Sequence, residues 1–263
     1  MLKNTARSIR TRAAAGLVTA AALALALAGC GQDSTSPEEA RGQAVGKTAA
    51  KTAGAGSQSS VDCATAKCIA LTFDAGPGPH TPQLLDTLKE KKVHATFFLL
   101  GKRHVDTYPD TVRRAAAEGH EIANHTWTHR RLDQLKPDEI RSELDRTQQA
   151  VKALTGREPT LMRPPQGRTN NDVKAVTEEL GLSQVLWSAT AKDYDTTDSA
   201  LIQQRILDQA GRDGIILLHD IYDGTVPAVP GIIDALRKRG YTFVTVPQLL
   251  APGTPRPGTL YRP

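Results

Sequence analysis

Short apolar runs alternate with longer, helix-like segments through most of this 263-residue chain. The apolar runs, which predict β-strands, lie at residues 69–73, 95–100, 120–123, 160–163, 183–187, 214–219 and 241–246. The segments between them begin at proline or a capping residue and mostly end near glycine, which predicts helices at 82–92, 109–118, 137–155, 171–180, 198–210 and 229–239. The strands are apolar throughout instead of alternating, so they predict parallel strands covered by helices.

A β/α barrel and an open doubly wound sheet both fit this alternation. Polar residues that could do chemistry follow strands along the whole chain: Asp74, His125, Arg163, Asp193 and His219. A barrel gathers the carboxyl ends of all its strands around one mouth, whereas an open sheet concentrates its site at one switch point. The spread of polar residues therefore favours a closed or nearly closed barrel.

The first thirty residues are typical of an export signal. A basic start leads into an Ala/Leu-rich run at 13–28 that ends in Leu-Ala-Gly-Cys at Cys30. A transmembrane helix is the alternative, although the run is short and rich in alanine for that purpose. The ending resembles the lipobox of bacterial lipoproteins, which implies cleavage before Cys30 and a lipid on its sulfur; ordinary secretion is the milder alternative. Residues 31–66 are rich in small polar residues without apolar periodicity, which predicts a flexible tether.

Two further cysteines, Cys63 and Cys68, are separated by only four residues. In an oxidising compartment they favour a small disulfide loop. A two-cysteine metal site is less favoured, because no second cysteine pair completes a ligand set. Most of the formal charge of +5 comes from residues 1–61, and no basic stripe with interleaved aromatic residues follows. Nucleic acid is therefore not an expected partner.

His125 and His129 have a spacing that places two imidazoles side by side on one helical turn. The same spacing occurs in metal sites. Taken alone it fits a capped helix start, with histidines in ordinary hydrogen bonds, about equally well. Polar residues at the other strand ends favour the metal site.

The remaining strand-end residues each have a functional and a structural interpretation. Asp74 follows a buried strand and could be a base, a helix cap or an Asx turn. His219 follows an apolar strand, and the pKa of a histidine suits proton transfer, although a hydrogen-bonded core histidine is the alternative. Arg163 can hold a carboxylate and keep it ionised, or it can be a solvated loop cation.

Five motifs in chain order resemble those of the polysaccharide deacetylases of carbohydrate esterase family 4, the NodB-homology domain. They are Thr-Phe-Asp-Ala-Gly-Pro at 72–77, His-Thr-Trp-Thr-His at 125–129, Arg-Pro-Pro-Gln-Gly at 163–167, Asp-Tyr at 193–194 and Leu-Leu-His at 217–219. The resemblance covers about residues 68–250. It implies a distorted (β/α)7 barrel that hydrolyses N-acetyl or O-acetyl groups of polysaccharides with a divalent metal, often zinc.

The resemblance also implies roles for individual residues. Asp74 matches the catalytic base, and the backbone N–H that follows it is expected to help hold the oxyanion. His219 matches the general acid. The other implied roles are metal ligation by His125 and His129, orientation of the base by Arg163, pairing with the acid by Asp193, and substrate binding by Leu217, Pro165 and Tyr194.

The first motif departs from the family pattern, because Ala75 stands where the family has the aspartate that is its third metal ligand. Gln166 and Tyr194 also depart from it, since they stand where an aromatic residue and tryptophan are common, and both are expected to be changes in the substrate groove. A methyl group cannot coordinate a metal, so zinc is expected to bind more weakly than usual. The first hypothesis is an active, metal-dependent deacetylase. The second is a carbohydrate-binding member without activity, and a purely structural lipoprotein is the least favoured.

The sequence thus predicts an export signal at 1–30, a tether at 31–66, a deacetylase domain at 67–250 and a C-terminal tail at 251–263. An enzyme held outside the cell by a membrane lipid anchor would act on the adjacent wall. Peptidoglycan is the first expected substrate, followed by chitin-like oligomers and acetylated xylan.

Overall fold

The structure is a computed structural model that describes residue 1, residues 33–45 and residues 61–263. The predicted signal at 2–30, with Cys30, lies outside the described residues. The chain divides into two units, Met1–Gly31 and Gln32–Pro263, and the fold below is that of the second. Within the described ranges, no helix is both long enough and apolar enough to cross a membrane.

Strands and helices alternate as the sequence predicts. The strands are β1 (Ser34–Thr35), β2 (Cys68–Asp74), β3 (Thr96–Leu99), β4 (Glu121–Asn124), β5 (Leu161–Met162), β6 (Ser183–Val185), β7 (Ala189–Thr190), β8 (Gly214–His219), β9 (Thr242–Val244) and β10 (Leu260–Tyr261). The helices are α1 (Pro37–Val45), α2 (Thr81–Glu90), α3 (Pro109–Ala117), α4 (Pro137–Thr155), α5 (Asn171–Glu179), α6 (Ser199–Gln209), α7 (Thr225–Lys238) and α8 (Val246–Leu250). Short turns are η1 (Gly101–Val105), η2 (Leu132–Gln134), η3 (Pro165–Gly167) and η4 (Asp193–Asp195).

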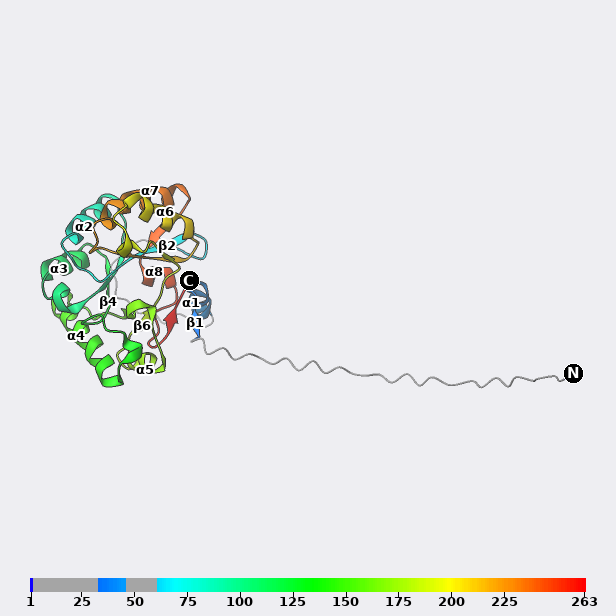
Figure 1. Cartoon of the computed structure of the whole chain (residues 1–263), viewed down its shortest axis with the longest axis horizontal. Helices are drawn as coiled ribbons and strands as arrows, with labels where there is room; N and C mark the ends of the chain where they lie inside the picture. The colour runs from blue at the N-terminus through cyan, green and yellow to red at the C-terminus, as the bar shows by residue number, and fades with distance from the viewer. Residues whose placement is uncertain (2–32, 46–60) are drawn as a thin grey trace. The chain divides into compact units, whose positions relative to one another are not determined.

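All strand pairs in the sheet are parallel, and helices α2 to α7 surround the strands (Figure 1). The sheet runs in the order β1-β10-β6-β5-β4-β3-β2-β8-β7. Because β6 and β7 belong to one short segment, 183–190, that segment joins the β5 side of the sheet to β8 and curls the sheet into a barrel. The barrel prediction is confirmed. The distortion is visible at β2, which pairs with β9 through residues 68–70 and with β3 through residues 72–74.

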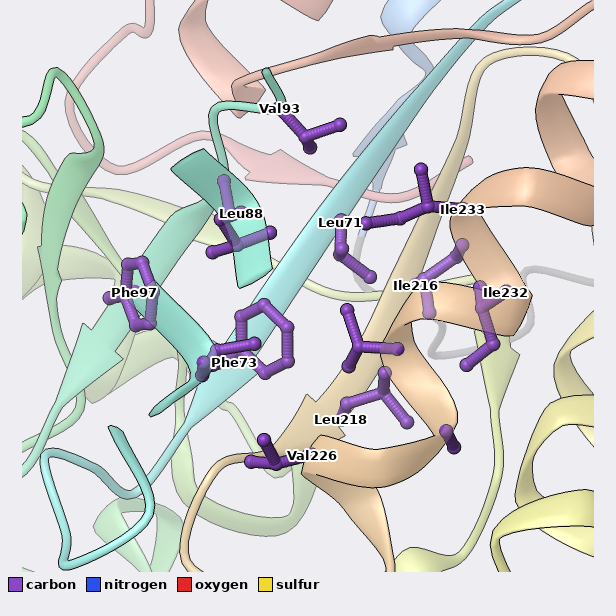
Figure 2. Close-up of a cluster of buried hydrophobic side chains, with 14 of the residues drawn as sticks. Leu71, Phe73, Leu88, Val93, Phe97, Ile216, Leu218, Val226, Ile232 and Ile233 are labelled. Carbon is purple, nitrogen blue, oxygen red and sulfur yellow. The ribbon is translucent and has the colours of Figure 1, made fainter. Parts of the chain in front are cut away.

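The alternation of side chains along β2 divides the core into two layers. Ile69, Leu71 and Phe73 pack against the surrounding helices, as the cluster with Ile232 and Ile233 of α7 shows (Figure 2). Cys68 and Ala70 instead belong to a second cluster with residues of the other strands, among them Phe98, Ala123, Leu161, Val185 and Ile215. Thr72 and Asp74 share the parity of this second set. Parity therefore directs Asp74 to the inside of the barrel.

The N-terminal segment differs from the predicted tether. β1 pairs with β10, and α1 is fixed by Arg41, whose guanidinium donates to the carbonyl of Leu249 at 2.8 Å and to Asp213 Oδ2 at 2.6 Å. The prediction of a flexible tether is therefore wrong for residues 34–45. The predicted tail at 251–263 also takes part in the sheet, because β10 pairs with β6. These pairings depend on distant residues, which local composition does not reveal.

Replacing Arg41 by alanine is expected to lower the free energy of unfolding by about 1–3 kcal/mol, because the nearly buried carboxylate of Asp213 loses its 2.6 Å partner and keeps only Arg212 at 3.7 Å. Urea denaturation measures the change. The control is Arg113→Ala, which removes an exposed pair with Asp110 and should cost less than about 1 kcal/mol. Equal effects of the two substitutions would contradict a fixed N-terminal segment.

The cysteine pair lies at the opposite end of β2 from Asp74. Cys63 and Cys68 form a disulfide, and both are fully buried in the second core cluster. The bond therefore fastens the segment that enters β2 and takes no part in the mouth of the barrel.

Candidate active site

Parallel pairing brings the predicted site residues to one end of the barrel. Asp74 at the end of β2 lies opposite His219 at the end of β8 in the strand register. His125 directly follows β4, and Arg163 directly follows β5. Asp193 begins the turn η4 after β7. The five residues that the sequence placed at strand ends therefore meet at one mouth.

Asp74 and Arg163 form a buried ion pair. Arg163 is fully buried, and its Nη1 donates to Asp74 Oδ1 at 2.6 Å and to Thr72 Oγ1 at 2.8 Å. Its Nε donates to the carbonyl of Val185 at 3.0 Å, and its guanidinium lies over the ring of Phe98 at 4.1 Å. A charge-assisted bond of this kind stabilises the ionised carboxylate and fixes its direction. Thr72 is part of this arrangement, and its position two residues before Asp74 on the same strand face could have identified it.

His125 and His129 lie together, with ring centroids 4.9 Å apart. They do not lie on a helical turn as the spacing suggested. Residues 125–129 form a loop in which Thr126 (φ 75°) and His129 (φ 62°) adopt the left-handed region. A regular helical turn is incompatible with these two conformations. That part of the prediction is wrong, although the proximity it was meant to explain is present.

The loop is held by acceptors that the sequence did not point to. Glu143 of α4 accepts from the N–H groups of Trp127 and Thr128 at 3.2 and 2.8 Å and from the Thr128 hydroxyl at 2.6 Å. Asn124 Oδ1 accepts from the N–H of Thr126 at 2.8 Å. These bonds satisfy donors that a helix would otherwise have satisfied, so the loop can retain its positive φ angles.

The surroundings of both imidazoles favour the neutral form, which is the form that binds a metal. Nδ1 of His125 bonds to the carbonyl of Arg163 at 2.8 Å, so this nitrogen carries the proton and Nε2 keeps its lone pair. Burial lowers the pKa of His125 to about 4, against the opposing charge of Asp74. The pKa of His129 is also lowered, first by partial burial of its ring. Nε2 of His125 lies 3.8 Å from Asp74 Oδ2.

The protein groups nevertheless do not complete a catalytic metal site. Such zinc sites have three protein ligands, and within the described part of the chain no group of three or more His, Cys, Asp or Glu residues could hold a metal ion. Ala75 stands beside Asp74 with φ 63°, a conformation that aspartate tolerates better than alanine. Its N–H donates to the carbonyl of Phe98 at 3.1 Å. The expectation that this N–H holds an oxyanion is therefore wrong, because the sheet already uses it.

His219 and Asp193 form a second pair across the mouth. Nδ1 of His219 bonds to Asp193 Oδ1 at 2.8 Å, while Asp193 Oδ2 accepts from the His219 N–H at 2.7 Å and from the Thr225 hydroxyl at 2.8 Å. Burial by itself would lower the pKa of His219, but the hydrogen bond and charge of Asp193, helped by Asp74 and Asp220, raise it above its ordinary value. The protonated imidazolium is thereby favoured.

Replacing Asp193 by asparagine is expected to lower the pKa of His219, because burial then acts without the opposing carboxylate. NMR titration of the His219 ring measures this independently of any reaction. The control is Asp195→Asn, which neutralises a nearby carboxylate that pairs with Arg205 instead. An unchanged pKa in the Asp193 variant would contradict the pairing.

The three expected substrate-binding residues lie at different depths. Leu217 and Pro165 are buried, whereas Tyr194 is 57% exposed. Tyr194 lines a hollow of about 540 Å³, the tyrosine hollow, together with Asp193, Asp195, Thr196, Thr197, Ile221, Tyr222 and Asp223. The ring of Tyr222 lies 5.5 Å from that of His219. Because Tyr222 follows His219 by only three residues, the sequence could have indicated that the two rings lie close together.

Comparison with known proteins agrees with this geometry. A family model described as polysaccharide deacetylase matches residues 62–185. A chitooligosaccharide deacetylase of Bradyrhizobium sp. is 36% identical over 204 residues, which cover 72% of this chain and 93% of that protein. This chain belongs to the polysaccharide deacetylase family. Its first curated relatives are longer: the peptidoglycan-N-acetylmuramic acid deacetylase PdaC of Bacillus subtilis is 41% identical over 184 residues, which are 70% of this chain and only 38% of PdaC.

Solved structures of family members share the fold. T48 deacetylase, solved with substrate, is 40% identical with a TM-score of 0.73 and covers 77% of this chain and 100% of its own. A mutant described as a CE4 family pseudoenzyme with restored enzymatic activity is 28% identical with a TM-score of 0.67, covering 71% of this chain and 68% of its own. One member of the family is thus described as a pseudoenzyme.

Proposed function

We propose that the protein removes N-acetyl groups from a polysaccharide, with Asp74 as the base and His219 as the acid. The observation that carries the proposal is the meeting of two complete pairs, Asp74 with Arg163 and His219 with Asp193, at one mouth of a polysaccharide deacetylase barrel. Named relatives that act on peptidoglycan and chitooligosaccharides support the same class of substrate.

The roles follow from the state of each group. Asp74 accepts a proton from the attacking water, whose oxygen forms a bond to the acetyl carbon. The carbon–nitrogen bond then breaks, and the free Nε2–H of His219 donates its proton to the leaving amine, so the products are acetate and an amine. Arg163 and Asp193 position these two groups. With an O-acetyl substrate, the proton goes to an alcohol oxygen instead.

We propose zinc as the divalent metal for the mouth, held by His125 and His129 alone and therefore weakly. Ala75 leaves the ligand set one carboxylate short, so the two histidines by themselves do not complete a catalytic zinc site. The same observation favours a second candidate function, in which the mouth binds a glycan without hydrolysing it.

We also propose where the protein is located and which polysaccharide it acts on. We place the protein outside the membrane with a lipid on Cys30, which the sequence of the signal supports. Peptidoglycan is the first substrate, then chitin-like oligomers and acetylated xylan. Leu217, Pro165 and Tyr194 are proposed to contact the sugar.

Acetate release tests the proposal against its alternative. The protein is incubated with peptidoglycan, chitotetraose and acetylated xylan, with and without added Zn²⁺ or Co²⁺. We expect acetate with added metal, and none from the Asp74→Asn or His219→Gln variants. No acetate with any metal, together with retained glycan binding, would replace this proposal by the second function.

A further inference from the structure

A second hollow lies beside the histidine pair. Its volume is about 290 Å³, and it is lined by Leu100, Lys102, Arg103, His104, Trp127 and Thr128. We call it the basic hollow. Trp127 and Thr128 belong to the loop between His125 and His129, and Nδ1 of His104 bonds to the carbonyl of Pro77 at 3.0 Å, close after Asp74. The hollow therefore adjoins the histidine loop and the segment that follows Asp74.

The walls of the basic hollow are held in place by the backbone. The N–H of Gly101 donates to the carbonyl of Thr126 at 3.1 Å, and that of Lys102 donates to the carbonyl of Trp127 at 2.8 Å. Gly101 is required here, because a Cβ at this position would fall on the Trp127 ring. The guanidinium of Arg146 lies over the same ring at 4.4 Å. The hollow is thus formed by two loops that are bonded to each other.

Lys102 and Arg103 are exposed cations, and the nearby carboxylate of Glu143 is engaged by the N–H groups of Trp127 and Thr128. The exposed side chains of Lys102 and Arg103 have no carboxylate within ion-pair distance among the residues that the structure describes. Arg103 also holds a left-handed conformation, with φ 67°. Unpaired surface cations are common, but here two adjacent ones line the same hollow as an aromatic ring.

The tyrosine hollow differs from the basic hollow in how its charged side chains are paired. Its three carboxylates each have a basic partner: Asp193 pairs with His219 at 2.8 Å, Asp195 with Arg205 at 2.8 Å and Asp223 with His80 at 2.9 Å. Among the described residues, each carboxylate of the tyrosine hollow contacts a basic side chain, whereas Lys102 and Arg103 have no carboxylate partner. A neutral sugar has no charge that could pair with these two cations. A carboxylate can pair with them through charge-assisted hydrogen bonds.

We infer that the basic hollow binds a carboxylate-bearing substituent of the glycan, with Trp127 against the sugar and with Lys102 and Arg103 on the carboxylate. The inference rests on the proposed function, because it assumes that an N-acetylated glycan occupies the mouth. It adds that the preferred glycan is anionic. Two sources share this chemistry in wall glycans: the lactyl ether of a muramic acid unit, and the carboxylates of a peptide stem attached to it.

Binding measured by calorimetry, without turnover, tests the inference. The probes are chitotetraose, a tetrasaccharide of alternating N-acetylglucosamine and N-acetylmuramic acid with free lactyl carboxylates, and the same tetrasaccharide carrying peptide stems. We expect the protein to bind at least one anionic probe roughly tenfold more tightly than chitotetraose at low salt, and which one identifies the source. In Lys102→Gln/Arg103→Gln the preference should fall below about threefold, with chitotetraose binding nearly unchanged.

A matched control and two single variants keep the result interpretable. Lys174→Ala/Lys238→Ala removes the same net charge from exposed positions of α5 and α7 and should keep the preference. Lys102→Gln and Arg103→Asn each test one cation, and asparagine tolerates the left-handed conformation of residue 103. Equal binding of neutral and anionic probes by the unaltered protein would overturn the inference and leave the proposed function standing. No binding of any probe would overturn both.

Discussion

Replacing Ala75 by aspartate is expected to raise zinc affinity by at least about 100-fold, because it adds a carboxylate to two neutral imidazoles and completes a three-ligand set. The backbone at residue 75 already has φ 63°, which aspartate accepts without the strain that most side chains would meet. Acetate release with added zinc should rise by a similar factor or more. Calorimetry with zinc and an acetate assay measure the two effects separately.

The variant Ala75→Asn separates the effect of charge from that of shape, because asparagine has nearly the same shape as aspartate. It fills the same space without supplying an anionic ligand, so zinc affinity should change far less. If Ala75→Asp binds zinc no better than the unaltered protein, another group already supplies the third ligand and the two-ligand description is wrong. A gain in zinc affinity without a gain in acetate release would favour the glycan-binding function.

Replacing Arg163 by methionine is expected to lower the free energy of unfolding by about 3–5 kcal/mol. The substitution leaves Asp74, whose side chain is only 3% exposed, as an uncompensated buried charge beside the barrel core. It also removes the donor to Thr72 and to the carbonyl of Val185. Urea denaturation followed by circular dichroism measures the loss.

The double variant Arg163→Met/Asp74→Leu shows whether the buried charge is the cause. It removes both charges and keeps apolar volume, so it should be less than half as destabilising as Arg163→Met alone. If the double variant is destabilised as much as the single one, lost packing around Arg163, including its contact with Phe98, accounts for the effect. Arg163→Lys should give an intermediate loss, since it keeps the charge but not the planar fork.

The barrel could be predicted because its strands are apolar on both faces and its polar residues follow strand after strand. Asp74 and His219 each end one of these apolar strands, and the parallel pairing of β2 with β8 places them opposite each other. The disulfide partners were likewise close enough in sequence to be named. These features depend on short-range pattern, which a single sequence displays.

Other features depend on contacts between distant segments. The conformation of residues 125–129 depends on Glu143, which no local motif connects to the histidines. The basic hollow exists because the loops after β3 and β4 are bonded to each other, and no local motif predicts that contact. β1 and β10 are two residues long and carry no apolar run, so only their pairing makes them strands.

The pairing of β1 with β10 also sets an order of events in folding. The two strands come from opposite ends of the domain, and β9, which occupies part of the edge of β2, comes from late in the chain as well. Contacts of such long sequence separation form slowly and only after both partners have been synthesised. The ribosome must therefore make the residues of β10 before the sheet can reach its final width. A growing chain that lacks the residues of β10 leaves the edge of β6 without its partner strand.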